Sequence, residues 1–377
     1  MAYPRPKKKR LKPRRKRKGD KIVIRVDKVI IKFDKRQQQW IRYIMDVYRF
    51  AYNRTVKYLR TNKVTSFFNI RTIIRSLLTD KQKEFIEECP SHFIDEAIHD
   101  VVKAYKTCFT NYKRANCKHF RLRYKKASSA IQTIAIPSEY FHKKKNSFCI
   151  SIMGLISSDK DIHGSKTCRL SWYKNNNAYI LYKPVDKPTV VVTGRKPECS
   201  LDPGIRTFQT LYSKTNVDEF GVDNYQWINP LLERIKKAKP GRGVSLFINR
   251  IYNRIKNKVD DLHWQTISSL VTTYDTILVG NMSTKGICQG NLYKKIKPVA
   301  YMLSHYKFNQ RLQAKAEQYG CTVHIVDERY TSKTCGGCFE RNHTLGASKT
   351  FSCPCGYIWD RDFNGARNIM LRHHNLM

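Results

Sequence analysis

The chain of 377 residues is long enough for two or three domains with apolar cores of their own. It carries 72 Lys and Arg against 30 Asp and Glu, a formal net charge of +42. Because that much like charge opposes compaction, the composition predicts a polyanionic partner, and aromatic residues at 12% exclude a simple disordered basic tail. No apolar run approaches the ~18 residues of a membrane-spanning helix. The charged N-terminus is followed by no apolar stretch, so we expect no signal peptide.

The N-terminus holds the densest charge. Residues 5–18 include 11 Lys and Arg and no acid, which leaves +31 on the rest of the chain. We predict that residues 1–20 are disordered, because like charges repel and almost nothing apolar is present to be buried. Residues 6–10 (PKKKR) are typical of a nuclear localisation signal, although a phosphate-binding arm has the same composition. The remaining charge favours nucleic acid as the partner; a ribosome-like or chromatin-like binder fits the charge equally well.

The next segments alternate between strand and helix patterns. Residues 21–33 (KIVIRVDKVIIKF) are rich in Ile and Val and predict a strand or a hairpin. Residues 36–60 and 92–116 carry apolar side chains at spacings of three and four, which predicts two amphipathic helices. Basic side chains elsewhere around the first helix are candidates for phosphate contacts: Arg42, Arg49, Arg54, Lys57 and Arg60.

From about residue 128 the pattern becomes β. The runs AIQTIAIP, SFCISIMGL, CRLSWYK, AYILYKPV and TVVVTG are short and are separated by polar or Gly/Pro breaks. Several short strands at this spacing predict a small barrel, which the early strand would join. We therefore expect a β-barrel built from residues 21–35 and 126–196, with residues 36–125 inserted in it as a helical domain.

Residues 197–377 predict an α/β domain. In chain order we expect a strand in ECSLDPG, a hairpin with RTFQTLYS, helix over 230–274, a strand at 276–280, helix around 301–318, a strand at 321–328 and a last helix at 360–373. Strands first, followed by strands that alternate with helices, is the order expected of an RNase H-like sheet.

Four of the 12 cysteines are clustered: Cys335, Cys338, Cys353 and Cys355. Without a secretory signal we expect no disulfide framework. Two short cysteine pairs joined by a loop favour four thiolates around one structural Zn²⁺, with chance clustering and redox thiols as the alternatives. The second pair has only one residue between its cysteines, which makes that turn unusually tight.

Acids are scarce in this basic chain, and five of them stand where strands end or helices begin: Asp202, Asp327, Glu328, Asp360 and Asp362. Carboxylates gathered beside nucleic acid would repel one another unless they bind cations, and Mg²⁺ prefers oxygen ligands. Two such ions ~4 Å apart would stabilise the attacking water and the leaving oxygen of phosphodiester hydrolysis. The alternative is that each acid caps a helix or pairs with a lysine.

Three of these segments carry a family resemblance. LDPGIRT around Asp202, YTSKTCGGC (330–338) and DRDFNGARNI (360–369) resemble the RuvC-type domain of the TnpB nucleases, and still more that of their eukaryotic and giant-virus relatives, the Fanzor proteins. KNKVDDLHWQTISSL (256–270) and YRFAYNRTV (48–56) extend the likeness. It covers most of the chain in order, but its motifs are specific only over 198–377.

The resemblance implies a Mg²⁺-dependent RNA-guided DNA endonuclease, related to the type V CRISPR nucleases. Its partners would be an omega-type guide RNA from the element's own end and a double-stranded DNA target beside a short recognition motif, with no membrane and no small-molecule substrate. The implied architecture is a wedge barrel, a helical recognition insertion and a RuvC domain over 197–377. That domain would carry a helical lid at about 225–270 and a zinc-binding insertion at 331–358, and the localisation signal places the protein in the nucleus.

One departure decides which acids the resemblance assigns. TnpB nucleases carry a catalytic Glu at the end of the middle RuvC strand, where this chain has Gly280. Fanzor proteins use a Glu on the following strand instead, and Glu328 matches it. The implied catalytic Mg²⁺ ligands are therefore Asp202, Glu328 and Asp362, with Asp360 and Asp327 secondary. An inactive guide-RNA and DNA-binding protein, or a transposase with an RNase H-like fold, are the alternatives.

Overall fold

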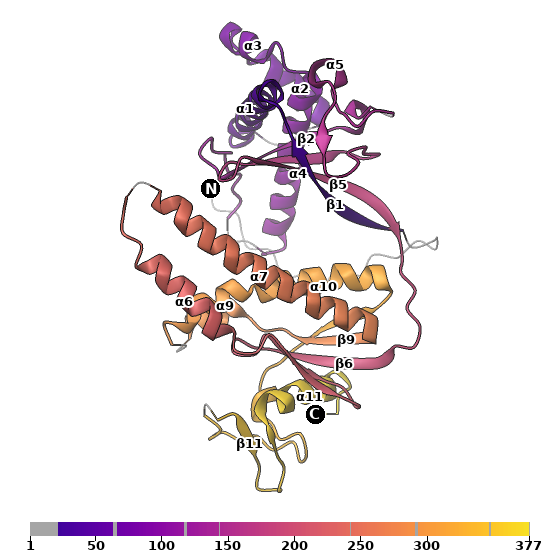
Figure 1. Cartoon of the computed structure of the whole chain (residues 1–377), viewed down its shortest axis with the longest axis vertical. Helices are drawn as coiled ribbons and strands as arrows, with labels where there is room; N and C mark the ends of the chain where they lie inside the picture. Colours follow the sequence, from indigo (N-terminus) through magenta and orange to yellow (C-terminus); the bar gives the residue numbers. More distant parts are fainter. Residues whose placement is uncertain are drawn as a thin grey trace. The chain divides into compact units, whose positions relative to one another are not determined.

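The computed structural model describes residues 22–62, 66–116, 119–142, 144–241, 243–290, 293–346 and 348–376. The chain forms two compact units, Met1–Lys187 and Pro188–Met377 (Figure 1). The predicted basic tail and its localisation signal, residues 1–20, lie outside the described residues. Within the described part of the chain, no helix combines the length and apolar character needed to cross a membrane.

The first unit combines helices with one sheet. Its helices are α1 (Lys35–Leu59), α2 (Phe67–Ser76), α3 (Asp80–Ile86), α4 (Ser91–Lys113), the 3₁₀ turn η1 (Ser138–Tyr140) and α5 (Ile150–Met153). Its strands are β1 (Ile22–Lys32), β2 (Ile131–Ile136), β3 (Ser157–Ser158), β4 (Cys168–Tyr173) and β5 (Ala178–Pro188). The early strand and the two long amphipathic helices expected from the sequence are confirmed. A capping box starts α1, where the amide of Gln37 donates to Asp34 at 2.8 Å.

The strands of the first unit form an open sheet in the order β2-β4-β5-β1-β3, so the predicted closed barrel is wrong. A barrel needs every strand paired on both sides, but β2 and β3 are edge strands among the described residues, and β3 is only two residues long. Two expected strands are also missing: the segment SFCISIMGL contains α5, and TVVVTG (189–194) pairs with no strand. Too few paired strands remain to close the sheet.

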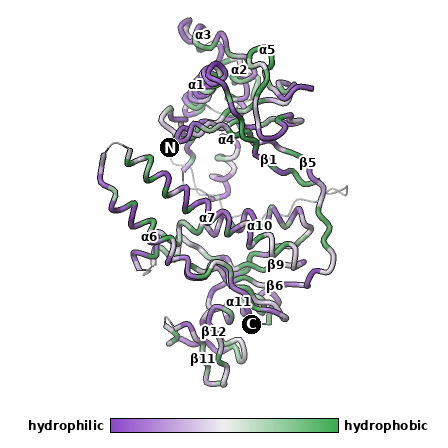
Figure 2. The backbone as a smooth tube through the Cα atoms, viewed as in Figure 1, coloured by the Kyte–Doolittle hydropathy of each residue, from purple (hydrophilic) through white to green (hydrophobic). Residues whose placement is uncertain are grey.

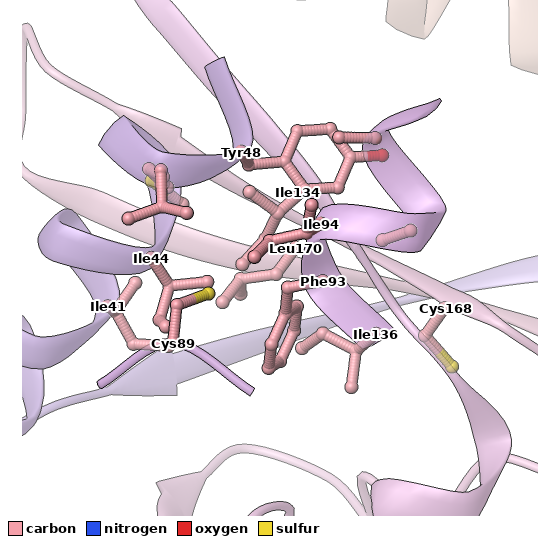
Figure 3. Close-up of a cluster of buried hydrophobic side chains, with 14 of the residues drawn as sticks. Ile41, Ile44, Tyr48, Cys89, Phe93, Ile94, Ile134, Ile136, Cys168 and Leu170 are labelled. Carbon is pink, nitrogen blue, oxygen red and sulfur yellow. The ribbon is translucent and has the colours of Figure 1, made fainter. Parts of the chain in front are cut away.

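The core of this unit lies between α1, α4 and one face of the sheet. Figure 3 shows Ile44 and Tyr48 of α1 and Phe93 of α4 meeting Ile134 and Leu170 of the sheet. All five side chains are essentially fully buried. Burying an aromatic or aliphatic side chain of this size contributes about 1.5–3 kcal/mol, so this seam holds the helices to the sheet.

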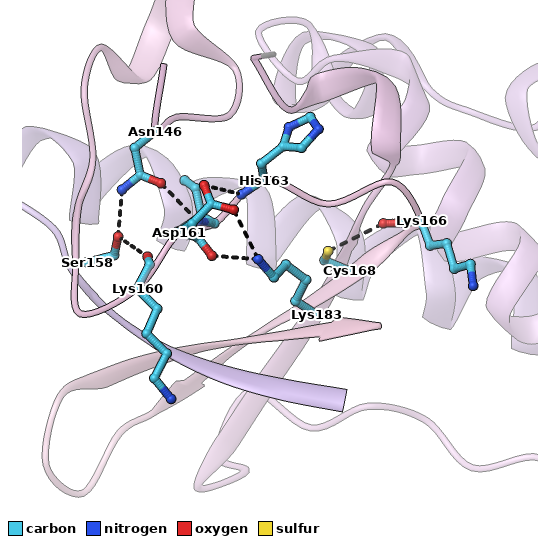
Figure 4. Close-up of polar contacts among 9 residues, drawn as sticks. Asn146, Ser158, Lys160, Asp161, His163, Lys166, Cys168 and Lys183 are labelled. Atoms are coloured by element: carbon cyan, nitrogen blue, oxygen red, sulfur yellow. Dashed lines mark hydrogen bonds and ion pairs between the residues drawn. The ribbon is translucent and has the colours of Figure 1, made fainter. Parts of the chain in front are cut away.

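Polar contacts fix the segment that links β3 to β4 (Figure 4). The Lys183 ammonium on β5 donates to the main-chain oxygen of Asp161 at 2.7 Å and pairs with its carboxylate at 3.2 Å. Asn146 donates to the Ser158 hydroxyl at 2.7 Å and accepts from the amide of Ile162 at 2.9 Å. Side chains therefore order a stretch that has few strand hydrogen bonds of its own.

The second unit is a mixed sheet between helical layers. Its strands are β6 (Lys196–Pro203), β7 (Gln209–Tyr212), β8 (Val217–Phe220), β9 (Tyr274–Gly280), β10 (Thr322–Val326), β11 (Thr350–Ser352) and β12 (Ile358–Asp360). Its helices are α6 (Asn224–Lys236), α7 (Val244–Thr273), α8 (Thr284–Gln289), α9 (Ile296–Leu303), α10 (His305–Tyr319), the 3₁₀ turn η2 (Thr331–Lys333) and α11 (Arg361–His373). The expected helical stretch at 230–274 is two helices, and the helix around 301–318 breaks at Ser304, whose φ is +52°.

The five main strands lie in the order β10-β9-β6-β7-β8. Strands β6, β9 and β10 are parallel, whereas β7 and β8 continue antiparallel from β6. Leu201 pairs with Val279, and Gly280 pairs with Val326, so the three parallel strands end at the same edge of the sheet. The chain order expected of this unit, a run of strands followed by strands alternating with helices, is confirmed.

The two faces of the sheet are covered by different helices. Figure 1 shows α7 and α10 on one face and α11 on the other. Leu201 and Val279 join the apolar core beneath α7 and α10, whereas Leu278 packs with Ile369 of α11. In Figure 2, hydrophobic and hydrophilic residues alternate along the tube of α7, as expected of a helix that buries one side. Because successive side chains of a strand point to opposite faces, these contacts identify which residues of each strand face α11.

Candidate active site and metal centre

Asp202, the next-to-last residue of β6, points toward α11. Two residues earlier, the Ser200 hydroxyl donates to the main-chain oxygen of Ala366 at 2.7 Å, and side chains two apart on a strand share a face. A Cβ atom placed on Gly365 would lie 2.5 Å from Asp202 Oδ2. The carboxylate therefore packs directly against the backbone of α11, at a position that only glycine can occupy without displacing it.

Glu328 reaches the same side of the sheet from the neighbouring strand. It follows β10 by two residues and shares the face of Val326, which packs with Ile369 of α11. Its Oε2 lies where a side chain on Gly280 would begin, so the Glu carboxylate fills the space that the glycine leaves open. The strand that ends at Gly280, β9, and the strand that leads to Glu328, β10, are paired neighbours in the sheet.

The surroundings of the Glu328 carboxylate fit a cation ligand. Oε2 is buried and has no hydrogen-bond partner among the described residues. Burial, and then the charge of Asp327, raise the pKa of Glu328 to about 7. A buried carboxylate oxygen without a donor is costly unless a cation or a proton neutralises it.

The third carboxylate stands at the start of α11. Asp360 is the N-cap of this helix, and its Oδ1 accepts from the amides of Asp362 at 2.8 Å and Phe363 at 3.2 Å. Asp360 is therefore engaged in capping, whereas Asp362 lies in the first turn, where burial and the charge of Asp360 raise the pKa of its carboxyl group.

Asp327 is the chain neighbour of Glu328 and acts on it through its charge. Its own carboxylate pairs with Arg329 at 3.4 Å.

Electrostatic coupling links the three remaining carboxylates. Burial, followed by the charges of Glu328 and Asp362, raises the pKa of Asp202 well above its ordinary value. The described residues nevertheless hold no carboxylate group as tightly gathered as the cysteine cluster described next. Oxygen ligands at the edge of a parallel sheet suit Mg²⁺, and Asp202, Glu328 and Asp362 are the residues that could hold it.

The four predicted cysteines come together. The Sγ atoms of Cys335, Cys338, Cys353 and Cys355 all lie within 4.8 Å of one another. The distance is 3.6 Å between Cys335 and Cys355, and 3.5 Å between Cys338 and Cys353. Four thiolates at ~2.3 Å from a tetrahedral Zn²⁺ would be ~3.8 Å apart, so this group could bind zinc.

The tight second pair is accommodated by the turn of the β11–β12 hairpin. The Gly356 amide donates to the main-chain oxygen of Cys353 at 3.0 Å, and the Cys353 amide donates to that of Tyr357 at 2.9 Å. Gly356 has a φ of +87°, which a residue with a side chain rarely adopts. This turn brings both thiols to the same side despite the single residue between them.

Most of the candidate phosphate-binding residues, which lie on α1 or at its C-cap, already have partners. The contacts are Arg42 with Tyr179, Asn177 and Trp172, Arg49 with Asp46, Arg54 with the main-chain oxygen of Leu77, and Arg60 with that of Leu122 and the ring of Tyr124. Lys57 is exposed, and its side chain has no partner among the described residues. A cavity of about 420 Å³ lies nearby, lined by Asp46, Arg49, Phe50, Asn53, Arg54 and Phe85.

Sequence reasoning missed several residues that shape the carboxylate site. Gly365 is needed for the close approach of Asp202, and a glycine inside a helical pattern is the signal that could have identified it. Asn281 accepts from the amide of Glu328 at 3.3 Å and helps to set its position. Nothing in the sequence marks that contact, because it depends on the pairing of β9 with β10.

Comparison with known proteins places the chain in a family. Residues 305–369 match the family model Cas12f1-like, TNB domain. The TnpB-like protein L770 of Acanthamoeba polyphaga mimivirus is 30% identical over 370 residues, which cover 89% of this chain and 71% of that protein. The CRISPR-associated endodeoxyribonuclease Cas12f1 of Sulfoacidibacillus thermotolerans is 35% identical over 71 residues, which cover 18% of this chain and 17% of that protein.

The superposition on the protein chain of a solved Cas12f1–sgRNA–target DNA complex covers 92% of this chain and 98% of that chain, with a TM-score of 0.38 and 12% identity. An alignment that covers 89% of the chain extends into both units. This chain belongs to the family of TnpB-like proteins.

Proposed function

We propose that this protein is an RNA-guided DNA endonuclease of the Fanzor type, with an RNase H-like nuclease domain in its second unit. The observation that carries the proposal is the position of Glu328, whose unpartnered Oε2 occupies the space over Gly280. The carboxylate of Glu328 occupies the space over Gly280 where TnpB nucleases carry a catalytic Glu. This position argues against a site that has lost that carboxylate without replacement. Membership of the TnpB-like family and the likeness to an endodeoxyribonuclease support nuclease chemistry.

In this proposal Asp202, Glu328 and Asp362 hold Mg²⁺. When bound, the divalent ions stabilise the negative charge that develops on the phosphate during hydrolysis. The protein contributes rigid placement: Asp202 lies against Gly365, Glu328 is held through Asn281, and the cap by Asp360 fixes the first turn of α11, where Asp362 stands. Asp327 has no part in the site.

We further propose the partners and the domain roles. A guide RNA of the omega type and double-stranded target DNA account for the net charge of +42, and a short motif beside the target would be recognised by the protein itself. Residues 36–125 serve as the recognition domain within a wedge domain formed by 21–35 and 126–196. Residues 197–377 form the nuclease domain with its lid at about 225–270, and residues 6–10 direct the protein to the nucleus.

The four cysteines bind one structural Zn²⁺ in this proposal, within the insertion 331–358. All four tetrahedral positions are then taken by thiolates, so the ion shapes the fold and has no open position for chemistry.

Substitution of the carboxylates tests the assignment. We expect Glu328→Ala, Asp202→Ala and Asp362→Ala each to reduce cleavage of a matched target plasmid by at least ~100-fold, because each removes several kcal/mol of transition-state stabilisation. Binding of guide and target should survive in a gel-shift assay, since the ions stabilise the transition state more than the complex. Asp327→Ala is the matched control on the same loop and should keep its activity.

Other results of these assays would support a different residue assignment or a different function. Full activity of Glu328→Ala would move the assignment to Asp327. A wild-type protein that binds guide and target without cutting would be a guide-RNA and DNA-binding protein, the reading that the loss of Glu at Gly280 suggests by itself. Joined rather than broken DNA ends would identify a transposase.

A further inference from the structure

The helix that carries Asp362 is also bound to the first cysteine pair. Asn364, one turn into α11, has no exposed surface, although its amide is polar. Its Oδ1 accepts from the amide of Gly336 at 3.1 Å, and its Nδ2 donates to the main-chain oxygen of Thr334 at 2.9 Å. Gly336 lies between the ligands Cys335 and Cys338, so this one amide holds the loop of the first pair.

Two more side chains of α11 hold the same loop. Asn368 is also fully buried, and its Nδ2 donates to the main-chain oxygens of Thr331 at 2.8 Å and Thr334 at 2.7 Å. Arg367 donates to the main-chain oxygen of Gly336. Both polar groups of the Gly336 backbone are therefore bound by α11.

These hydrogen bonds join the cysteine loop to the helix, beside ring contacts between the β11–β12 hairpin and α11, where Trp359 stacks on Phe363 and Arg367 lies over the ring of Tyr357. The apolar residues of the loop form a small cluster of their own, Cys335, Leu345 and Phe351. The apolar residues of α11 pack instead with the sheet, where Ile369 and Met370 meet Leu278 and Val326. The two clusters are separate, and the amides of Asn364 and Asn368 between them are buried and costly to leave unpaired, so their hydrogen bonds contribute to holding the loop on the helix.

The same stretch of helix positions the carboxylates. Asp362 lies two residues before Asn364 on the same helix, and Gly365 provides the surface against which Asp202 Oδ2 packs. Any shift of α11 would therefore move Asp362 and open the space beside Asp202 together.

We propose that Asn364, Arg367 and Asn368 are positioning residues that couple the metal-loaded cysteine cluster to the carboxylate site through α11. A bound metal fixes Cys335 and Cys338, the loop between them fixes the helix, and the helix fixes Asp362 and Gly365. This inference rests on the proposed function for its catalytic half, whereas its structural half concerns only the cysteine cluster and α11.

Release of metal from the cysteines tests the structural half without any cleavage assay. The full chain is loaded with Zn²⁺, and transfer of the ion to a chromogenic chelator is followed over time. We expect Asn364→Ala to release zinc ~10-fold faster, the lower end of the effect usual for groups that support metal ligands. Co²⁺ loading should show altered thiolate-to-metal absorption in the same variant. Unchanged release and unchanged absorption would overturn the proposal.

A matched control separates this effect from general loosening of the unit. Asn224 is 1% exposed, and its Nδ2 donates to the main-chain oxygens of Gly221 at 2.6 Å and Arg206 at 3.3 Å, away from the cysteine loop. Asn224→Ala loses two hydrogen bonds from a buried side chain to main-chain oxygens and should release zinc at the wild-type rate. If Asn364→Ala fails to fold, Arg367→Ala is the milder variant, because that side chain is only partly buried.

The catalytic half is tested in the guided complex at saturating target. Asn364→Ala should slow single-turnover cleavage ~10-fold while target affinity is unchanged. In a Cys335→Ser background, where the loop is already released, the same substitution should have no further effect. An additive loss would show that Asn364 acts by another route and would overturn the coupling. If the wild-type protein does not cut at all, the proposed function fails, and the zinc-release measurement alone decides whether α11 holds the loop.

Discussion

A single glycine on α11 sets the room available to the first carboxylate. Gly365 is buried, and a Cβ atom at this position would lie 2.5 Å from Asp202 Oδ2. We expect Gly365→Ala to displace the carboxylate and to reduce cleavage at least ~10-fold, since misplacement of a catalytic group by about 1 Å can cost as much as 100-fold. The measurement is single-turnover cleavage beside thermal unfolding. Ala366→Gly is the neighbouring control, because it adds no atom near Asp202, and equal cleavage by Gly365→Ala and wild type would contradict the prediction.

Two buried histidines make the stability of the second unit depend on pH. The rings of His263 and His305 both stack on Phe208, with ring centroids 4.9 and 4.8 Å from it. Burial lowers the pKa of His263 to about 4 and that of His305 to about 3, and the nearby Arg311 also opposes protonation of His263. The unfolded chain binds these protons below about pH 6.5, whereas the folded chain does not until pH 4 or lower.

The sign follows from that difference. Between about pH 6.5 and 4 the unfolded state holds more protons, so stability rises with pH and falls on acidification, by up to about 1.4 kcal/mol per pH unit for each histidine. We expect the melting temperature to decrease as the pH is lowered from about 6.5 to 4.5. His305→Phe keeps the stacked ring and should make the melting temperature depend less steeply on pH. The same slope in His305→Phe and wild type would mean that other groups govern the acid response.

At the scale of secondary-structure elements, the β11–β12 hairpin connects the cysteines to α11 without an intervening loop. Asp360 pairs with Thr350 across the hairpin and is also the N-cap of α11. We expect a quadruple Cys→Ser variant of Cys335, Cys338, Cys353 and Cys355 to lose bound zinc in elemental analysis. Its melting temperature should fall, because metal binding contributes folding free energy. A metal-free wild-type protein, or a quadruple variant of unchanged stability, would contradict the structural zinc.

The sequence predicted individual helices and strands far better than the pairing between strands that are distant in the chain. The amphipathic period of α1 and α4 and the apolar run of β9 lie within single segments, so local pattern was enough to identify them. The barrel failed because closure depends on pairing between distant strands, and an apolar run such as SFCISIMGL has no strict period that separates a strand from a turn of helix.

The candidate site shows the same limit at finer scale. Strand alternation alone could not choose between Asp327 and Glu328, because the sequence does not say which face of β10 meets α11. The packing of Val326 against Ile369 supplies that information, and it places Glu328 on the side of Asp202. The ties from Asn364 and Asn368 to the cysteine loop were equally hidden, since buried hydrogen bonds to main-chain groups leave no spacing signal in the sequence.

At the scale of the whole molecule, the charge predicts how binding responds to salt. A net charge of +42 implies many phosphate contacts, each of which releases counterions. We expect affinity for guide RNA to fall by at least ~10³-fold between ~50 and ~200 mM salt, as for proteins with six or more such contacts. Filter binding across a salt series gives the slope. A slope equal to only one or two contacts would show that most of the charge lies outside the bound surface.

The separation of Asp202 and Asp362 along the chain has a consequence for biosynthesis. β6 is made early in the second unit, but the helix that covers it, α11, follows every other strand and helix described there. While α11 is still within the ribosome, Leu278 and Val326 lack their apolar cover, and the proposed carboxylate set lacks Asp362. Under the proposed function, a first unit that folds as its sequence emerges would gain its affinity for nucleic acid before the chain could cut. A chain terminated upstream of α11 would then compete for guide and target without breaking DNA.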